Sequence, residues 1–415
     1  MSAIEQRRLE CGMDLLVESM PAVRSVGVSW LITGGSASEP QEKQGLGAMM
    51  TEMLFRGAGP RDAREHADAM DRLGVSRSAS VQTFFMNISG VTLGLRVIEA
   101  LELFTDMLRN PIVDQADVEP VRDLCIQSIE ALADDPHGRV MLLARKMHAP
   151  SPINRSSMGT IETLKAITRN DLAHYWRQAA APIGSAIALA GDVDPDEAES
   201  TLNRLLDGWT GQSAPVTWGA SDHRGYHHET DDTNQVHIAV VHEAPCESSK
   251  DSILERVITS VLSGGMSGRL FTEVREKRAL VYSVSASYGA SRDFGRVVAY
   301  AGTTPDKAQE TLDVLLDQLR ALAGDSGAGA VSQDEFDRAI VGMKSNLVMS
   351  GESTSARAAA LGADWFRLGR PRSLEERAAA VEAVTLDDVN GYIARRSLGE
   401  ITVATIGPRE LCSSL

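Results

Sequence analysis

The chain has 415 residues, with 57 acidic and 41 basic side chains and a formal net charge of −16. This length exceeds what one hydrophobic core organises, so two or more domains are expected. Hydrophobic residues at 43% and charged residues at 24% are typical of a globular chain and exclude wholesale disorder. Because phosphate binding is driven by Lys and Arg, the acidic charge argues against nucleic acid or an anionic membrane as partner, and leaves basic or neutral peptides.

The cysteines and the beginning of the chain bear on the compartment. Cys11, Cys125, Cys246 and Cys412 lie far apart and form no C-x-x-C pair, which is typical of free thiols in a reducing environment. The first residues lack the charged-then-apolar pattern of a signal peptide, and no apolar run reaches the length of a membrane span. We therefore expect a cytoplasmic protein.

In the first half of the chain, strand-like and helix-like segments alternate. Residues 25–32 (SVGVSWLI) show an alternating pattern of side chains and a composition typical of β-strands, which predicts a strand. A helical pattern follows over 46–55. Two further strand regions are predicted over 74–81 and 84–95. A helix is predicted over 97–109, because its apolar residues recur on one face.

The second half repeats this order. A strand is predicted over 236–241, a helix over 253–262, strands over 281–287 and 296–301, and a helix over 308–322. The same order of five elements in both halves indicates a tandem duplication.

Two anchor pairs fix the offset of the repeat. Val26 corresponds to Val236 (236 − 26 = 210), and Leu101 corresponds to Leu312 (312 − 101 = 211). The segment between the copies is rich in Gly, Ser, Asp and His, as a linker is. We therefore predict a first α+β domain over 1–212, a linker over 213–232 and a second, homologous α+β domain over 233–415.

The most specific motif lies in the second domain, where residues 262–284 read LSGGMSGRLFTEVREKRALVYSV. This stretch resembles the second-domain signature of the pitrilysin-like, or insulinase-type, zinc peptidases, which include the mitochondrial processing peptidase subunits. The resemblance covers essentially the whole chain, since the duplication and the length also match. It implies two domains that each pack a mostly antiparallel sheet with helices. Ala279 stands where the family usually has Gly.

The resemblance assigns a role to two residues of this motif, Arg275 and Tyr282. In the family an Arg and a Tyr at this spacing complete the active site opposite the zinc domain. A guanidinium and a phenol suit this task, because peptide hydrolysis builds negative charge on the carbonyl oxygen. The alternative is structural: Arg275 would pair with Glu273 or Glu276 on the surface, and Tyr282 would pack in a sheet.

The zinc motif of the family is missing from the first domain. Residues 45–57 read GLGAMMTEMLFRG, and their ends align well with the family's H-x-x-E-H helix. Ala48 and Glu52 stand at the two His positions, and Thr51 stands at the position of the Glu that serves as general base.

The distal zinc ligand is missing as well. In the predicted helix 119–135, Ser128 aligns with the family's last zinc ligand and Val121 with its supporting Glu. An Ala and a Ser offer no useful metal bond, and Glu52 alone cannot hold zinc. We therefore expect no metal and no other cofactor in this chain, and no peptidase activity of the chain by itself.

Other constellations are weaker. His223, His227 and His228 fall in the predicted linker, and His237 and His242 on the next strand point to opposite faces, so a substitute metal site is not favoured. The Gly-rich stretch 264–268 lacks the Lys-Ser/Thr of a phosphate loop.

Two functions stay open. In the first, the chain is the non-catalytic subunit of a heterodimeric zinc peptidase, whose homologous partner carries H-x-x-E-H and the zinc while this chain presents Arg275 and Tyr282 to the peptide. In the second, the chain is a structural core subunit or peptide-binding scaffold with no hydrolysis in its complex. A peptidase with relocated catalytic residues has no support in the sequence.

Overall fold

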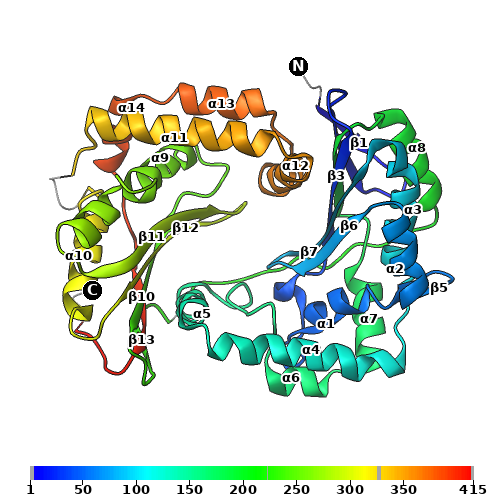
Figure 1. Ribbon diagram of the computed structural model, residues 1–415, viewed down its shortest axis with the longest axis horizontal. Helices are drawn as coiled ribbons and strands as arrows, with labels where there is room; N and C mark the ends of the chain where they lie inside the picture. Colours follow the sequence, from blue (N-terminus) through cyan, green and yellow to red (C-terminus); the bar gives the residue numbers. More distant parts are fainter. Residues whose placement is uncertain (1–3, 222, 325–328, 413–415) are drawn as a thin grey trace. The chain divides into compact units, whose positions relative to one another are not determined.

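A computed structural model describes residues 4–221, 223–324 and 329–412. It divides into two compact units (Figure 1). Unit 1 comprises the chain up to Ala131, Ser151–Trp218 and Ser350–Arg372; unit 2 comprises Leu132–Pro150, Gly219–Met349 and the chain from Ser373 onward.

Unit 1 is built on a six-stranded sheet in the order β1-β2-β8-β3-β7-β6. Only β2 and β8 pair in parallel; the other four pairings are antiparallel. The strands are β1 (Ile4–Arg8), β2 (Asp14–Ser19), β3 (Ser25–Thr33), β6 (Ser76–Val81), β7 (Phe85–Leu93) and β8 (Ala186–Gly191), and a separate short hairpin joins β4 (Gly57–Ala58) to β5 (Arg61–Asp62).

Helices cover both faces of this sheet, with α2, α3 and α8 on one side and α12 on the other (Figure 1). The helices are α1 (Leu46–Met53), α2 (Ala63–Arg72), α3 (Val97–Arg109), α4 (Gln115–Ala133), α6 (Ile161–Ala166), α7 (Arg169–Ala179), α8 (Pro195–Leu205) and α12 (Thr354–Leu368), with short 3-10 turns η1 (Ser36–Ser38), η2 (Gln41–Lys43) and η3 (Gly94–Arg96).

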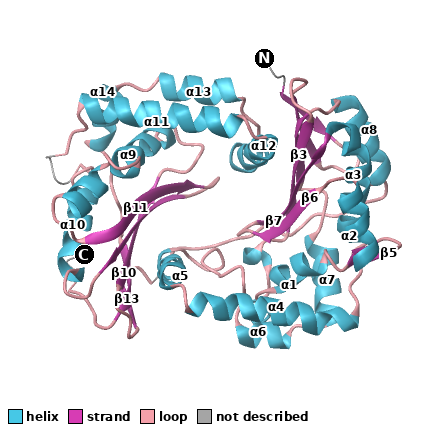
Figure 2. Ribbon diagram, in the orientation of Figure 1, coloured by secondary structure: helices cyan, strands magenta, loops and turns pink. Residues whose placement is uncertain are grey.

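Unit 2 repeats the plan with a five-stranded sheet in the order β11-β12-β10-β13-β9. Again one pair, β13 with β9, is parallel, and the rest are antiparallel (strands in magenta in Figure 2). The strands are β9 (Gly225–Thr230), β10 (Val236–Ala244), β11 (Val281–Ala290), β12 (Gly295–Thr303) and β13 (Thr402–Gly407). The helices are α5 (Pro136–His148), α9 (Ser252–Ser263), the π-helical segment η4 (Phe271–Glu276), α10 (Ala308–Arg320), α11 (Gln333–Gly351), α13 (Leu374–Glu382) and α14 (Leu386–Ile393).

The fold class predicted from the sequence is confirmed. Read from the parallel pair outward, the strands β2-β8-β3-β7-β6 of unit 1 correspond one for one to β9-β13-β10-β12-β11 of unit 2. The anchor residues Val26 and Val236 lie on the equivalent strands β3 and β10, and Leu101 and Leu312 lie on the equivalent helices α3 and α10. All four side chains are fully buried.

The units are not continuous in sequence, in contrast to the predicted domains 1–212 and 233–415. Helix α5 of the first half belongs to unit 2, and α12 of the second half belongs to unit 1. The physical reason is that central strands of each sheet are apolar on both faces: every residue of β8 and of β13 is buried. Strands that are apolar on both faces need a helix packed on each face of the sheet.

Each exchanged helix has its own small core. Ala358, Leu361 and Trp365 of α12 pack on the alanines of β8, and the Trp365 indole donates to Asp14 at 3.1 Å. Val140 and Ala144 of α5 pack on β10 and β13. The predicted linker 213–232 also contains structure, since residues 225–230 form β9 and pair with β13. No helix in the described residues is long and apolar enough to span a membrane.

Candidate functional site

Helix α1 carries the degenerate zinc positions, and its N-terminus is held by a buried carboxylate. Gly45 precedes the helix with φ +98°, a conformation that favours glycine. Glu39 accepts hydrogen bonds from the Gly45 and Gly47 backbone N–H groups, both at 2.7 Å. Burial raises the pKa of Glu39 to about 7, although these two hydrogen bonds lower it. Nothing in the sequence singles out Glu39, because an acid before a helix is ordinarily an exposed residue.

None of the four predicted zinc-site positions offers a metal-binding geometry. Ala48 is half-buried against the core, and Thr51 is buried with its hydroxyl donating to the Ala48 carbonyl at 2.9 Å. Glu52 and Ser128 are exposed, and the Ser128 hydroxyl donates to the Leu124 carbonyl at 3.0 Å. Across the described parts of the chain, no three His, Cys, Asp or Glu side chains come together as a metal site. These residues do not fit zinc.

A cysteine that the sequence analysis did not single out for this site lies beside these positions. Cys125 on α4 is buried, and burial together with the charge of Glu52 raises the pKa of its thiol to about 12. The interaction with Glu52 places α4 next to α1, as expected for the two helices of a zinc site. A thiol with a pKa raised in this way is mostly protonated at neutral pH, which disfavours a role as nucleophile.

In unit 2 the predicted pair Arg275 and Tyr282 is brought together. The Cζ atom of Arg275 lies 4.8 Å from the ring centroid of Phe271 and 5.3 Å from that of Tyr282. Both distances are within the range of cation–π contacts. The Tyr282 side chain is 83% exposed, so its hydroxyl is open to a ligand.

The structural alternative for Arg275 is not what the fold shows. Glu273 is occupied by Lys277 at 2.6 Å and Arg278 at 2.8 Å, and Glu276 is exposed. Within the described residues, Arg275 makes no ion pair. Its guanidinium instead contacts the Phe271 and Tyr282 rings, and its N–H donors lie in the guanidinium plane.

The backbone departs from regular structure three times between residues 271 and 282. Residues 271–276 form a π-helix, a rare structure that is frequent at functional sites. Ala279 has φ +49° and is the one non-glycine residue with positive φ in the part of the chain that the structure describes. The β11–β12 register shifts between Val281 and Ser283, so Tyr282 occupies a β-bulge.

These departures explain how the motif presents its side chains. The left-handed conformation at Ala279 accounts for the Gly that the resembling family usually has there. A bulge re-aims the side chain that it carries, and here that side chain is Tyr282. Backbone strain of this kind persists where surrounding structure enforces it and is concentrated at functional sites.

The histidines do not assemble into a site. His237 shares a hydrogen bond of 2.8 Å with the Tyr300 hydroxyl, whereas His242 is fully buried in a network with Arg396 and Glu255. His228 bonds Thr405 at 2.9 Å. These three histidines therefore have separate structural partners.

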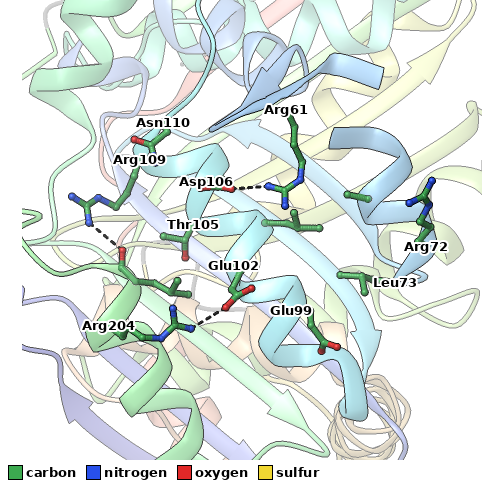
Figure 3. A pocket seen from close by; sticks show the side chains of 13 residues that line it. Arg61, Arg72, Leu73, Glu99, Glu102, Thr105, Asp106, Arg109, Asn110 and Arg204 are labelled. Atoms are coloured by element: carbon green, nitrogen blue, oxygen red, sulfur yellow. Dashed lines mark hydrogen bonds and ion pairs between the residues drawn. The ribbon is translucent and has the colours of Figure 1, made fainter. Parts of the chain in front are cut away.

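A cavity of about 590 Å³ in unit 1 lies between α2, α3 and α8 (Figure 3). Its walls carry the ion pairs Arg61–Asp106 at 3.1 Å and Arg204–Glu102 at 2.9 Å. Arg109 donates to the carbonyl of Leu205, at the end of α8, and to that of Asp207. Arg109 and Arg204 lie in the last turns of their helices, where cations are favourable. The cavity contains none of the predicted site residues.

Known proteins that resemble this chain share its fold. The family model "Insulinase (Peptidase family M16)" matches residues 15–160, and the model "Peptidase M16 inactive domain" matches residues 166–343. An uncharacterised zinc protease of Streptomyces coelicolor is 26% identical over 98% of this chain and 90% of its own length. One of Bacillus subtilis is also 26% identical, over 97% of this chain and 98% of its own length.

Solved structures share the fold at lower identity. A peptidase M16 inactive domain from Pseudomonas fluorescens superposes with a TM-score of 0.88 at 20% identity, covering 100% of both chains. A chain from complex III of Candida albicans gives a TM-score of 0.84 at 19% identity, covering 98% of this chain and 96% of that one. The two family models, the relatives that match along nearly the whole chain and the shared fold lead to one conclusion: this chain belongs to the insulinase family of peptidases, family M16.

Proposed function

We propose that this chain is the non-catalytic subunit of a heterodimeric zinc peptidase, in which it supplies Arg275 and Tyr282 while a homologous partner supplies H-x-x-E-H and the zinc. The observation that carries this proposal is the contrast between the two sites. At the zinc positions stand Ala48, Thr51, whose hydroxyl bonds within its own helix, and the exposed residues Glu52 and Ser128. The segment with Arg275 and Tyr282, in contrast, has an irregular backbone that presents both side chains.

The chemistry of the two residues suits peptide binding. A peptide carbonyl that is being attacked gains negative charge, and preorganised donors that meet this charge lower the barrier. The Tyr282 hydroxyl is exposed, and the in-plane donors of Arg275 are free of carboxylates among the described residues. Together they can bind the carbonyl groups of a peptide whose cleavage is driven by the partner's zinc.

The sheets offer a place for an extended peptide. Strand β6 is the edge of the unit 1 sheet and lies beside α1, and β11, which carries Tyr282, is the edge of the unit 2 sheet. An edge strand can accept an extended peptide as an additional strand. The substrates that fit this mode are short or unfolded peptides, and the charge of −16 favours basic ones.

The test is to assay the chain alone, a zinc-bearing homologue alone and the two mixed, with unstructured peptides as substrates. We expect activity of the mixture to fall by roughly 10²-fold with Arg275→Ala or Tyr282→Phe, as for loss of one oxyanion donor. Arg278→Ala, which removes a neighbouring arginine bonded to Glu273, is the matched control and should have little effect. Undiminished activity in both site variants would refute the proposed role.

A structural subunit is the second candidate, and one comparison favours it. The similar chain from Candida albicans belongs to complex III by its own description. A chain of this type would bind partners without any hydrolysis. A stable assembly of this chain that contains no zinc-bearing homologue and no peptidase activity would support it over the first candidate. A cytoplasmic location is proposed for either function.

A further inference from the structure

We propose that Phe271 is a positioning residue, whose ring holds the Arg275 guanidinium in the orientation in which Arg275 binds a peptide carbonyl or carboxylate. This inference rests on the proposed function of Arg275 and extends it to a residue outside the Arg–Tyr pair. Phe271 would act on the ligand only through Arg275.

The Arg275 guanidinium contacts two aromatic rings, those of Phe271 and Tyr282. Phe271 begins the π-helical segment and Arg275 follows four residues later, so both lie on one side of it. The i→i+5 hydrogen bond from Lys277 N–H to the Thr272 carbonyl, at 3.0 Å, closes this wide turn. The Arg275 Cζ atom is closer to the Phe271 ring, at 4.8 Å, than to the Tyr282 ring, at 5.3 Å.

The two rings differ in how firmly they are held. Tyr282 is 83% exposed, whereas Phe271 is half-buried in a segment anchored by Leu270 and Val274, both of which are fully buried in the unit 2 core. Phe271 itself is not part of that core cluster. Its ring is therefore the fixed surface on which Arg275 rests, and packing of the core does not account for a phenylalanine at this position.

The ring contacts bear on which ligand group Arg275 can take. A guanidinium donates hydrogen bonds in its own plane, so a ring that covers its face leaves these donors free. The acceptor that fits is a planar oxygen group lying in that plane, which is a backbone carbonyl or a terminal carboxylate of a peptide. A leucine at position 271 would keep apolar volume but would lose the aromatic face.

The experiment is a double-mutant cycle in the mixed complex, with kcat and KM measured separately. Phe271→Leu should lower kcat/KM by about five- to thirty-fold, the loss expected for one cation–π contact of about 1–2 kcal/mol. Phe271→Tyr, which keeps the face, should retain activity, and Phe294→Leu is a control at another half-buried phenylalanine. In the Arg275→Ala background, Phe271→Leu should cause no further loss. An equal loss in both backgrounds would overturn the proposal.

A second measurement separates this inference from the proposed function. The Nε–Hε signal of Arg275, followed by NMR in the isolated chain, should report an ordered side chain that becomes mobile in Phe271→Leu and stays ordered in Phe271→Tyr. An inactive mixture with this NMR result would refute the proposed function and leave the positioning role supported. An Arg275 side chain that is equally mobile in all three proteins would refute the positioning role, whatever the activity.

Discussion

The two units share a strand order, but the buried carboxylates at the equivalent helices α1 and α9 are held in different ways. Unit 1 buries Glu39 ahead of α1, with backbone N–H groups as partners. Unit 2 buries Glu255 in the equivalent helix α9, where Arg396 donates to it at 2.5 Å and Tyr392 at 2.8 Å. Burial raises the pKa of Glu39, whereas for Glu255 the hydrogen bonds and charge of Arg396 outweigh burial and lower the pKa.

The difference extends to the two sites. Helix α1 is regular. Of its residues that align with the family's zinc motif, Ala48 has a small side chain, the Thr51 hydroxyl bonds within the helix, and Glu52 is exposed. The segment 271–282 keeps a π-helix, a left-handed alanine and a β-bulge, each of which costs stability relative to regular backbone. A feature that costs stability and carries no function is readily lost. This contrast supports the proposal that the segment 271–282 carries the function of the chain.

The five tryptophans provide a way to observe the units separately. Trp30, Trp176, Trp209, Trp218 and Trp365 all belong to unit 1. Tryptophan fluorescence therefore follows the unfolding of unit 1, and far-UV circular dichroism follows both units.

The largest expected effect on stability comes from breaking the buried ion pair of unit 2. Arg396→Ala leaves Glu255 buried without its cation, so we expect a loss of about 3–5 kcal/mol in the free energy of unfolding of unit 2. Arg395→Ala, which breaks the exposed pair with Asp251, is the control and should cost less than about 1 kcal/mol. Urea unfolding by circular dichroism measures both. Equal losses would contradict the structure.

The second prediction concerns the pH dependence of unit 1. Because the pKa of Glu39 rises from 4.5 to about 7 on folding, its contribution to stability is greatest below about pH 4.5 and is lost as the pH rises through 7. The full change corresponds to about 3 kcal/mol. His66, whose pKa is lowered by burial, acts in the opposite direction.

The variant Glu39→Gln isolates this contribution. We expect the variant to be less stable than the wild type at pH 5, where the wild-type carboxyl is neutral. At pH 8 the two proteins should have equal free energies of unfolding, or the variant should be the more stable one. Urea titrations followed by tryptophan fluorescence at both pH values measure the difference. A difference between variant and wild type that is independent of pH would show that Glu39 does not titrate in this range.

The third prediction tests the exchanged helix α12. A Cβ atom at Gly27 on β3 would lie 2.3 Å from the Thr354 carbonyl oxygen at the start of α12. Gly27→Ala should therefore destabilise unit 1 by about 1–3 kcal/mol through overpacking. Gly289→Ala on β11, where a Cβ meets nothing within 4 Å, should have no such cost. Tryptophan fluorescence that unfolds at the same urea concentration in Gly27→Ala and wild type would contradict the packing of α12.

The smallest expected effect is a gain. Ala279→Gly removes the cost of a left-handed alanine, about 1–2 kcal/mol, and adds the smaller entropic cost of glycine. We expect unit 2 to be stabilised by up to about 1 kcal/mol, seen by circular dichroism. A clear loss of stability would mean that Ala279 is not strained.

Much of this organisation could be predicted from periodicity and motif. The helix predicted over 97–109 is α3 with the same bounds. The predicted repeat offset of about 210 residues relates strand β3 to its equivalent β10. The exchange of α5 and α12 could not be predicted, because the alternation of a strand does not say which helix covers its second face. Glu39 and Phe271 were also missed, since their roles depend on contacts made only in the folded chain. The pairing of Arg275 with Tyr282 followed from the family resemblance.

The most direct test of the contrast between the two sites is the zinc content of the purified chain after dialysis, measured together with its peptidase activity. The proposed function predicts no stoichiometric zinc and no hydrolysis by the chain alone, with hydrolysis appearing when a zinc-bearing homologue is added. One zinc per chain, retained with peptide hydrolysis that Arg275→Ala abolishes, would contradict it.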